Sequence, residues 1–254
     1  MTEIEPLLQA EGLTKRFGEF TAVNDVDFTV QPNETKALIG PNGAGKTTFQ
    51  NLLTGKLSAT EGTITFDGED VTSVPPHERA QRGIIRKYQI TSVYEDETVI
   101  ENMRLAFRSR ASSPWKLLRT HDDSDIRDRI EELLEIANLN DKQDTMVGTL
   151  SHGEKQWLEI VMAVGAEPEL LLLDEPTSGI SVGETNDTVD LIKEIRETEN
   201  VAIVVIEHDM DFIRKVSESI TVLDRGEIIA SGTIDEIERN ETVQQIYLGE
   251  AADA

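Results

Sequence analysis

Residues 40–48 of the sequence, GPNGAGKTT, have the types and spacing of a phosphate-binding loop. Glycines let a backbone curl around phosphate oxygens, and a helix that follows adds N–H donors and the positive end of its dipole. Lys46 would reach the β- and γ-phosphates, and the Thr47 hydroxyl would ligate Mg²⁺. A glycine-rich surface turn is the alternative, but it needs no lysine and threonine at the start of a helix. The nucleotide-binding residues expected here are Gly40, Pro41, Asn42, Gly43, Ala44, Gly45, Lys46, Thr47 and Thr48.

An acidic pair, Asp174 and Glu175, follows the apolar run ELLLLD. Such a run predicts a strand buried on both faces, and ligands of open α/β sheets bind at the carboxyl ends of their strands. Asp174 can hold Mg²⁺ there, and Glu175 can polarise the water that attacks the γ-phosphate. Capping of a following helix is the alternative for an acidic pair. The loop upstream favours the catalytic interpretation.

Two further polar residues are candidates for the same crevice. His208 ends the run VAIVVIEH, so it would lie at the next strand end, where it could sense the γ-phosphate and bridge to Glu175. A plain surface histidine is the alternative. Gln89, in IIRKYQI, lies where the sheet region gives way to helical sequence, and its amide could reach Mg²⁺ or the attacking water.

The segment LSHGEKQWLEI predicts a second helix N-terminus able to bind phosphate. Ser151 and Gly153 are its candidate ligands, although helix capping alone would account for Ser151. One active site rarely needs two such N-termini. We therefore expect a site shared between two chains.

The elements that must position these residues follow from periodicity. The first ninety residues indicate strands and turns, residues 98–137 are mainly helical, and strands then alternate with helices. This order predicts an α/β fold with a parallel sheet covered on both faces. We expect one domain over residues 1–254, with a nucleotide-binding core formed by 1–90 and 168–254 and an inserted helical subdomain over 91–167.

Composition restricts the class of protein. The chain has 254 residues, no cysteine and a net charge of −25, so disulfides and thiolate sites are excluded. The acidic balance disfavours binding to nucleic acid or anionic lipid and favours a salt-adapted cytoplasm, where ions screen the self-repulsion. No run is long enough to cross a bilayer, and the first residues lack the features of a secretory signal. We expect a cytoplasmic protein.

Taken in order, these motifs resemble the ATP-binding subunits of ABC transporters over essentially the whole chain. The residues that carry the resemblance are Phe17 in KRFG, the loop at 40–48, Gln89, LSHGEKQ, LLLLDEP and His208. It implies a P-loop ABC-type ATPase with a parallel-sheet core, an antiparallel β subdomain and a helical subdomain. It also implies ATP and Mg²⁺ as ligands, with Phe17 stacked on adenine, although a phenylalanine there could equally be core.

The resemblance further implies partners. Ser151 and Gly153 of one subunit would close over ATP bound to a second ATP-binding subunit, identical or paralogous, and the helical subdomain would move membrane permease subunits on the inner face of the membrane. GIIRKYQITSVYEDETVIENMRLAF, LSHGEKQWLEI and VIEHDMDFI are similar to importers of branched-chain amino acids and of urea or short-chain amides. Trp157 and KYQ favour urea.

Alternatives and departures accompany this interpretation. A soluble ABC ATPase of assembly or repair, for example in iron–sulfur cluster assembly, would carry the same motifs, and a module that only binds ATP is a third possibility. Glu154 replaces the usual glutamine and would put a carboxylate near phosphates, and Ser181 replaces an aspartate or asparagine that faces the other subunit. We expect residues 89–107, with Val93 and Tyr94, to dock on the membrane partner.

Overall fold

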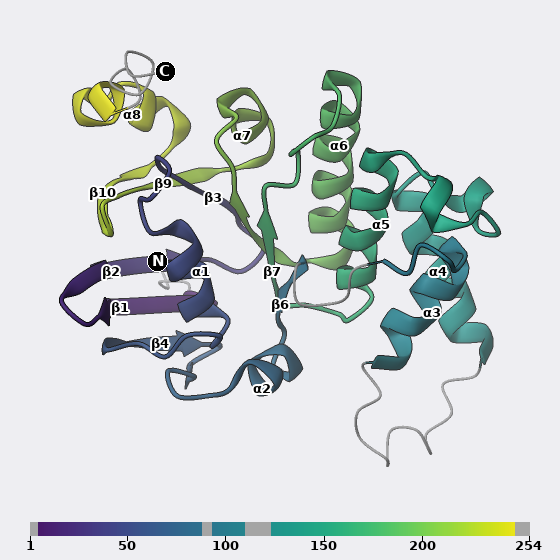
Figure 1. The fold of residues 1–254 in the computed structure, drawn as a ribbon, viewed down its shortest axis with the longest axis horizontal. Coiled ribbons are helices and arrows are strands. Elements are labelled where there is room, and N and C mark those ends of the chain that lie inside the picture. The colour runs from purple at the N-terminus through teal and green to yellow at the C-terminus, as the bar shows by residue number, and fades with distance from the viewer. Residues whose placement is uncertain (1–4, 88–92, 110–122, 247–254) are drawn as a thin grey trace.

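The computed structural model describes residues 5–87, 93–109 and 123–246, and these form two sheets flanked by helices (Figure 1). The smaller sheet has the order β2-β1-β4-β5 and is antiparallel. Side chains of β2 alternate between buried and exposed along much of the strand, as the period-two pattern of its sequence predicts. The strands are β1 (Leu8–Phe17), β2 (Phe20–Val30), β4 (Glu61–Phe66) and β5 (Glu69–Asp70).

The larger sheet has six strands in the order β10-β9-β3-β8-β7-β6. The neighbours β9, β3, β8, β7 and β6 pair in parallel, and β10 is antiparallel to β9. The apolar runs of β3 and β8 are buried throughout, as expected for a sheet covered on both faces. The strands are β10 (Glu227–Gly232), β9 (Ser219–Asp224), β3 (Thr35–Ile39), β8 (Ala202–Ile206), β7 (Leu170–Asp174) and β6 (Ile84–Arg86).

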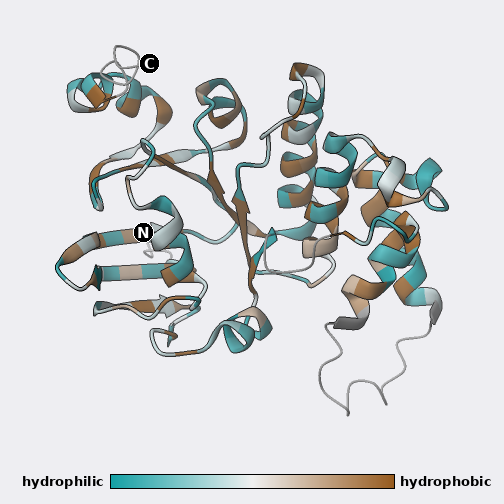
Figure 2. Cartoon of the chain, viewed as in Figure 1, coloured by the Kyte–Doolittle hydropathy of each residue, from teal (hydrophilic) through white to brown (hydrophobic). Residues whose placement is uncertain are grey.

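Helices cover both faces of this sheet, and apolar residues (brown in Figure 2) mark the central strands and the inner helix faces. Successive residues of one strand enter different cores: Leu172 packs toward α1 and the antiparallel sheet, whereas Leu171 and Leu173 pack toward the other helices. The expected parallel sheet with two covered faces is therefore confirmed. The helices are α1 (Lys46–Leu53), α2 (Pro76–Gln81), α3 (Val99–Ser109), α4 (Asp123–Ile136), α5 (His152–Val164), α6 (Val182–Glu199), α7 (Met210–Val216) and α8 (Ile234–Glu238).

Arg79 of α2 holds the carboxyl end of α1 in place. Its buried guanidinium donates to the carbonyls of Leu52 and Leu53, both at 2.7 Å, and to those of Thr72 and Val74. Burial lowers the pKa of Arg79 to about 10. Because the last carbonyls of a helix have no partner within it, this cation satisfies them and favours the negative end of the helix dipole. The contact fixes the helix that follows the phosphate loop.

Helix α5 begins inside the LSHGEKQ motif. Its apolar periodicity alone would suggest a start after the motif. Ser151 is its N-cap and accepts a hydrogen bond from the backbone N–H of Glu154, while the Glu154 carboxylate accepts from the N–H of Ser151. This capping box starts the helix at His152. Gly153 therefore lies in the first turn.

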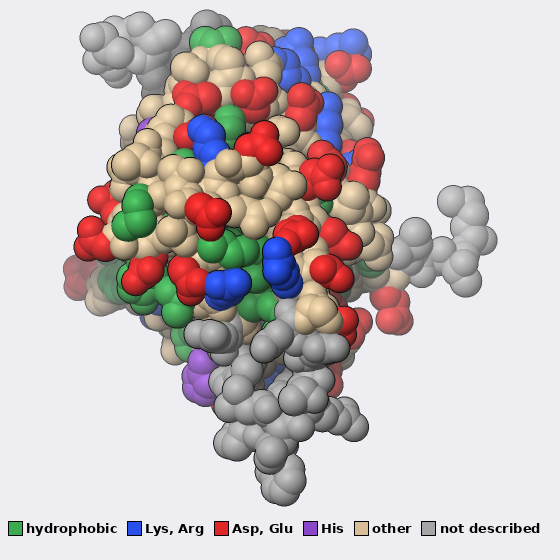
Figure 3. All heavy atoms as spheres, turned by 90° about the vertical axis from the view of Figure 1, so that its right-hand side faces the viewer, with side chains coloured by type: hydrophobic (Ala, Val, Ile, Leu, Met, Phe, Trp, Pro, Cys, Tyr) green, Lys and Arg blue, Asp and Glu red, His purple; other side chains and the backbone are tan. Residues whose placement is uncertain are grey.

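Acidic side chains are spread over the molecular surface on the side of α3 and α4, with fewer Lys and Arg among them (Figure 3). Several of the basic residues there form ion pairs on that side, such as Arg127 with Glu131 and Arg129 with Glu132. Exposed pairs of this kind stabilise the fold by at most about 1 kcal/mol each. The acidic excess of the sequence is therefore a surface property here.

Candidate nucleotide-binding site

Three candidate groups follow strands of the larger sheet whose carboxyl ends are aligned. Leu38 of β3 pairs with Ile206 of β8, and Ile206 pairs with Asp174 of β7. Neighbouring strands lie about 4.8 Å apart, so β3 and β7 are separated by roughly 10 Å. The phosphate loop after β3, Glu175 after β7 and His208 after β8 thus occupy one edge of the sheet, as the sequence predicts.

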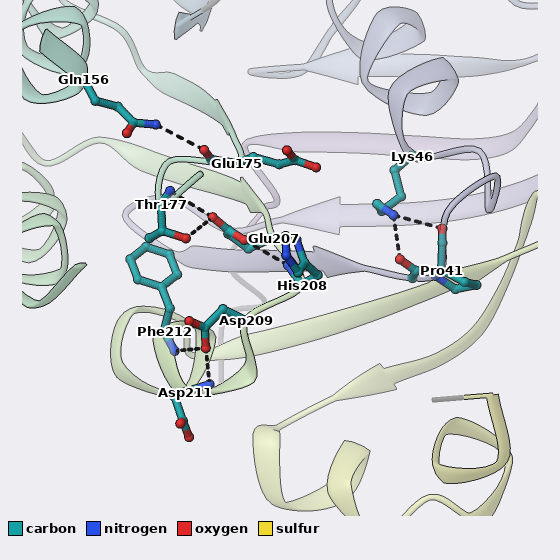
Figure 4. A network of polar contacts seen from close by, with 11 residues as sticks. Pro41, Lys46, Gln156, Glu175, Thr177, Glu207, His208, Asp209, Asp211 and Phe212 are labelled. Carbon is teal, nitrogen blue, oxygen red and sulfur yellow. Dashed lines mark hydrogen bonds and ion pairs between the residues drawn. The ribbon is translucent and has the colours of Figure 1, made fainter. Parts of the chain in front are cut away.

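The loop at residues 40–48 bends through glycines that other residues could not replace. Gly45 has φ +105°, and a Cβ added to it would lie 2.5 Å from the carbonyl oxygen of Ala22. Gly43 also has a positive φ, of +81°, but an added Cβ would meet no atom within 4 Å. The Lys46 ammonium donates to the carbonyls of Gly40 and Pro41 at 2.5 and 3.0 Å (Figure 4). The loop is therefore curled around its own lysine and open at Gly43.

The N-terminus of α1 is suited to an anion. Its N-cap is Gly45, which offers no side-chain acceptor, and its first turn contains no acidic residue. The N–H groups and positive dipole end of this turn therefore meet no acid in the first turn of their own helix. Thr47, in the same turn, is exposed. These are the properties that a phosphate-binding helix requires.

Glu175 has an unusual backbone conformation that three hydrogen bonds maintain. Its φ is +45°, a region that costs a residue other than glycine about 1–3 kcal/mol. The Glu175 N–H donates to Ile206 O at 2.8 Å, and its carbonyl accepts from the Ser178 N–H at 3.1 Å and from the Gln156 amide at 3.2 Å. In Figure 4 its carboxylate extends toward the side where Lys46 lies. Backbone strain kept in this way is typical of functional sites.

Asp174 is positioned by a buried arginine. Arg86 Nη2 donates to Asp174 Oδ2 at 2.8 Å, and Arg86 Nη1 donates to the side-chain oxygen of Asn51 on α1 at 2.8 Å. The described residues contain no group of three or more His, Cys, Asp or Glu arranged to hold a metal. Mg²⁺ commonly takes only one or two protein oxygens besides phosphate and water. The Asp174 carboxylate and Thr47 hydroxyl supply the hard oxygen ligands it prefers, so they fit this ion; Gln89 lies outside the described residues.

Glu207 is a site residue that the sequence analysis missed. It is 1% exposed, and its Oε1 accepts hydrogen bonds from the backbone N–H of Thr177, at 2.9 Å, and from the Thr177 hydroxyl, at 2.5 Å. Its Oε2 accepts from the His208 N–H at 3.0 Å (Figure 4). Glu207 thus ties the segment after Glu175 to the segment after β8. A carboxylate directly after a fully apolar strand was the available signal.

His208 lies at the expected strand end but has a different neighbour. Its side chain is 72% exposed, and Nδ1 lies 3.5 Å from Glu207 Oε2. This contact of the ring is thus with Glu207, and the expected bridge to Glu175 stays a prediction. Because the β8 strand ends at Ile206, the His208 side chain extends beyond the sheet. It remains available to a ligand at this edge.

The Glu154 carboxylate is held by two partners near the start of α5. It caps the N–H of Ser151 at 3.0 Å and pairs with Lys142. Burial favours the neutral acid, but the bonds from Lys142 and Ser151 outweigh it and hold the pKa of Glu154 below its ordinary value. The expected carboxylate near the phosphates is thus engaged within its own helix end. Ser151 is exposed and Gly153 is buried, and both lie beside Glu184 of α6.

Phe17 ends β1 and is 48% exposed, so it is not a core residue. The Lys15 ammonium lies 5.1 Å from the centre of its ring. Arg16 pairs with Thr21 at this end of the β1–β2 hairpin, and the adjacent Ala22 lies against Gly45 of the phosphate loop. An exposed aromatic face is therefore close to the loop in the fold.

None of the helices within the described ranges is both long and apolar enough to cross a membrane.

Comparison with known proteins finds ATP-binding transport proteins that match nearly the whole chain. A family model described as ABC transporter matches residues 23–178. The chain is 36% identical to the high-affinity branched-chain amino acid transport ATP-binding protein BraF of Pseudomonas aeruginosa, covering 97% of this chain and 99% of that protein. It is 34% identical to the lipopolysaccharide export system ATP-binding protein LptB of Haemophilus influenzae, covering 96% and 98% of the two chains.

Solved structures agree. The crystal structure of the ADP conformation of an ATP-binding cassette of an ABC transporter matches with a TM-score of 0.83 and 29% identity, covering 96% of this chain and 99% of that one. A nucleotide-free cassette matches with a TM-score of 0.81, 28% identity and the same coverage. The motifs, the strand-end site and these likenesses coincide, so the chain belongs to the ABC transporter family and is one of its ATPases.

Proposed function

We propose that this chain binds and hydrolyses ATP as the motor subunit of an importer whose cargo is a branched-chain amino acid. The observation that carries the proposal is the common height at which the phosphate loop, Glu175 and His208 leave the sheet. Two relatives support the cargo class: BraF, and LivG of Escherichia coli K12, a branched-chain amino acid transport ATP-binding protein that is 37% identical. Both are transport proteins, which favours transport over a role in iron–sulfur assembly.

Each residue of the site has a distinct role in this proposal. The N–H groups of residues 40–48 bind the phosphates, and the Lys46 ammonium moves from its own loop carbonyls to the β- and γ-phosphate oxygens. Phe17 stacks on adenine. Thr47 and Asp174 hold Mg²⁺, which would neutralise charge on the phosphates when bound. Glu175 accepts a proton from the attacking water, and His208 contacts the γ-phosphate.

The second helix N-terminus completes the site from a partner subunit. We propose a head-to-tail dimer in which Ser151 and Gly153 of one chain contact the ATP bound to the loop of the other. Val182, at the start of α6, supports this face as an interface because it is an apolar side chain that is 83% exposed. It follows Ser181, which is directed to the partner in this arrangement. The partner is a second copy or a paralogue.

The cargo rests on the relatives and not on the urea markers. Trp157 donates from its indole N–H to Thr188 on α6 at 2.9 Å and is buried, so it holds α5 and α6 together. Of KYQ, Lys87 pairs with Glu159 of α5, and the other two residues lie outside the described ranges. A urea or short-chain amide cargo therefore has only sequence likeness in its support. Transport of labelled leucine and urea by the reconstituted complex separates the two.

We propose that the membrane permease docks beside residues 89–107, of which the structure describes 93–107, and that the chain works at the cytoplasmic face. Tyr94 is 50% exposed, whereas Val93 is partly buried against the core. Val93 and Glu95 line a hollow of about 430 Å³, and Glu95 pairs with Lys155 of α5 at 2.7 Å. Tyr94→Ser should leave the ATPase rate of the isolated chain unchanged and lower transport; unchanged transport would place the docking surface elsewhere.

Two broader expectations also stay proposals. The first is the division into a core of residues 1–90 and 168–254 and a helical subdomain of 91–167. Such a division would suit a motor in which one part moves relative to the other. The second is adaptation to a salt-rich cytoplasm, which the net charge of −25 supports. The electrostatic screening length shortens from about 10 Å at 0.1 M salt to about 3 Å at 1 M, so high salt weakens the repulsion among these charges. The melting temperature should rise along a potassium chloride series, and a constant value would contradict this.

Glu175→Gln tests the proposed function directly. The amide keeps the shape of the side chain but cannot accept the water's proton, so hydrolysis should fall about 10²- to 10⁴-fold while ATP affinity is retained. ATP should then accumulate in a closed dimer, visible by light scattering with Mg²⁺. Gln156→Ala is an instructive companion, because it removes the hydrogen bond to the Glu175 carbonyl and leaves the carboxylate. If the Glu175→Gln variant turns over ATP at the normal rate, Glu175 is only structural.

A further inference from the structure

The Glu184 side chain joins two turns that belong to different helices. Its Oε2 accepts hydrogen bonds from the Ser181 N–H at 2.9 Å and from the Ser181 hydroxyl at 2.8 Å, within the capping box of α6. Its Oε1 accepts from the Ser151 hydroxyl at 3.1 Å, in the first turn of α5. A Cβ added to Gly153 would lie 2.7 Å from the same Oε1. The carboxylate therefore lies against both Ser151 and Gly153.

The donors around Oε1 are those that a phosphate would use. The Ser151 hydroxyl donates to the Glu184 carboxylate at 3.1 Å, and the backbone of Gly153 lies directly beside the same oxygen. Hydrogen bonds from Ser181, together with that from Ser151, lower the pKa of Glu184, so the side chain is an anion at neutral pH. A second carboxylate, that of Glu154, is close enough to repel it. A further anion at this turn would have to displace the Glu184 carboxylate.

We propose that the Glu184 carboxylate occupies the γ-phosphate position of the α5 turn and must leave it before two subunits close over ATP. This inference rests on the proposed function, in which Ser151 and Gly153 contact the partner's ATP. Glu184 then acts as an internal competitor: it keeps the turn satisfied in the separate subunit and sets how much ATP is needed for closure.

Release of Glu184 from the α5 turn would also affect the start of α6. The same carboxylate caps Ser181, the residue that faces the partner subunit in the proposed dimer. When phosphate takes the Oε1 partners, the link between the α5 turn and the α6 turn is broken. The competition therefore connects nucleotide contact at Ser151 with the position of the Ser181 segment.

The test measures ATP-dependent dimerisation in the Glu175→Gln background. Glu184→Gln removes the charge but keeps the shape, so the ATP concentration for half-maximal dimer should fall several-fold, up to about tenfold, as expected when a charge-assisted hydrogen bond is replaced by a neutral one. Glu184→Ala should lower it at least as much. ATP affinity of the isolated subunit should not change. Light scattering and equilibrium ATP binding give the two readouts.

Glu236→Gln is the matched control. Glu236 closes the same kind of capping box with Thr233 at the start of α8, away from the α5 turn, so its variant should leave the dimer midpoint unchanged. If Glu184→Gln leaves the midpoint unchanged or raises it while the parent dimerises normally, the competition is wrong and Glu184 only supports the turn. If the Glu175→Gln parent itself binds ATP but never dimerises, the proposed shared site falls, and the inference falls with it.

Discussion

The two helix N-termini assigned to phosphate are built in opposite ways. The N-cap of helix α1 is Gly45, which offers no side-chain cap, and the first turn contains no acidic residue. The N-cap of helix α5 is Ser151, which belongs to a complete capping box and also donates to the carboxylate of Glu184. Donors that are free of acids can receive an anion at any time, whereas donors already bonded to a carboxylate must first exchange it.

This difference orders the events of the proposed cycle. ATP can bind to the α1 loop of a single subunit, because the first turn of α1 contains no acidic residue to be displaced and Lys46 is bonded there to the carbonyls of Gly40 and Pro41. Engagement of the α5 turn comes second and needs both a second subunit and the displacement of Glu184. Binding and closure should therefore respond to different substitutions.

Lys46→Ala should have the largest effect on the first event. It removes the cation that faces the β- and γ-phosphates, in a protein whose net charge of −25 repels ATP. Loss of a hydrogen bond to a charged group corresponds to about 10- to 100-fold in affinity. Equilibrium binding of labelled ATP measures it. Wild-type affinity in this variant would remove the distinction between the two N-termini.

Gly153→Asp should act on the second event alone. The three atoms nearest to the new Cβ all belong to the flexible side chain of Glu184, so the fold should tolerate it, but the added carboxylate would repel the partner's γ-phosphate. Like charges 4 Å apart repel by about 1–4 kcal/mol at the effective dielectric of a protein surface, or roughly 5- to 1000-fold in hydrolysis. ATP affinity of the single subunit should be unchanged. A parallel loss of affinity would mean that the turn contacts ATP in its own subunit.

Glu154→Gln should have the smallest effect. The Glu154 carboxylate is bonded to Lys142 and to the backbone N–H of Ser151, so these partners offset its charge. Removing it should lower stability by about 0.5–1 kcal/mol and change the ATPase rate by less than about twofold. Urea unfolding and steady-state hydrolysis measure these two quantities. A large rise in hydrolysis would show that Glu154 does repel phosphate.

The sequence predicted the sheet and the meeting of its strand ends well because both depend on local patterns. Apolar runs define β3, β7 and β8, and the chemistry-bearing residues follow each run directly, so their meeting at one edge needs only parallel pairing. What it missed depends on contacts between distant residues. Arg79 reaching the end of α1, Glu207 holding Thr177, and Glu184 crossing to Ser151 leave no periodic trace in the sequence.

Glu154 illustrates a different limit. Its position in the motif suggested a carboxylate beside phosphate, but a glutamate three residues after a serine can equally close a capping box, and that local geometry prevails. Phe17 is the converse: sequence left core and ligand roles open, and its exposure excludes the core.

The shared site is the central claim, and mixing two defective chains tests it most directly. Lys46→Ala has a defective loop and an intact α5 turn, whereas Gly153→Asp has an intact loop and a defective turn. If each site combines the loop of one chain with the turn of the other, a mixed dimer contains one fully intact site. The account predicts that the mixture hydrolyses ATP clearly faster than either variant alone, and that a chain carrying both substitutions gives no such gain. A mixture no faster than the average of its two components would contradict it.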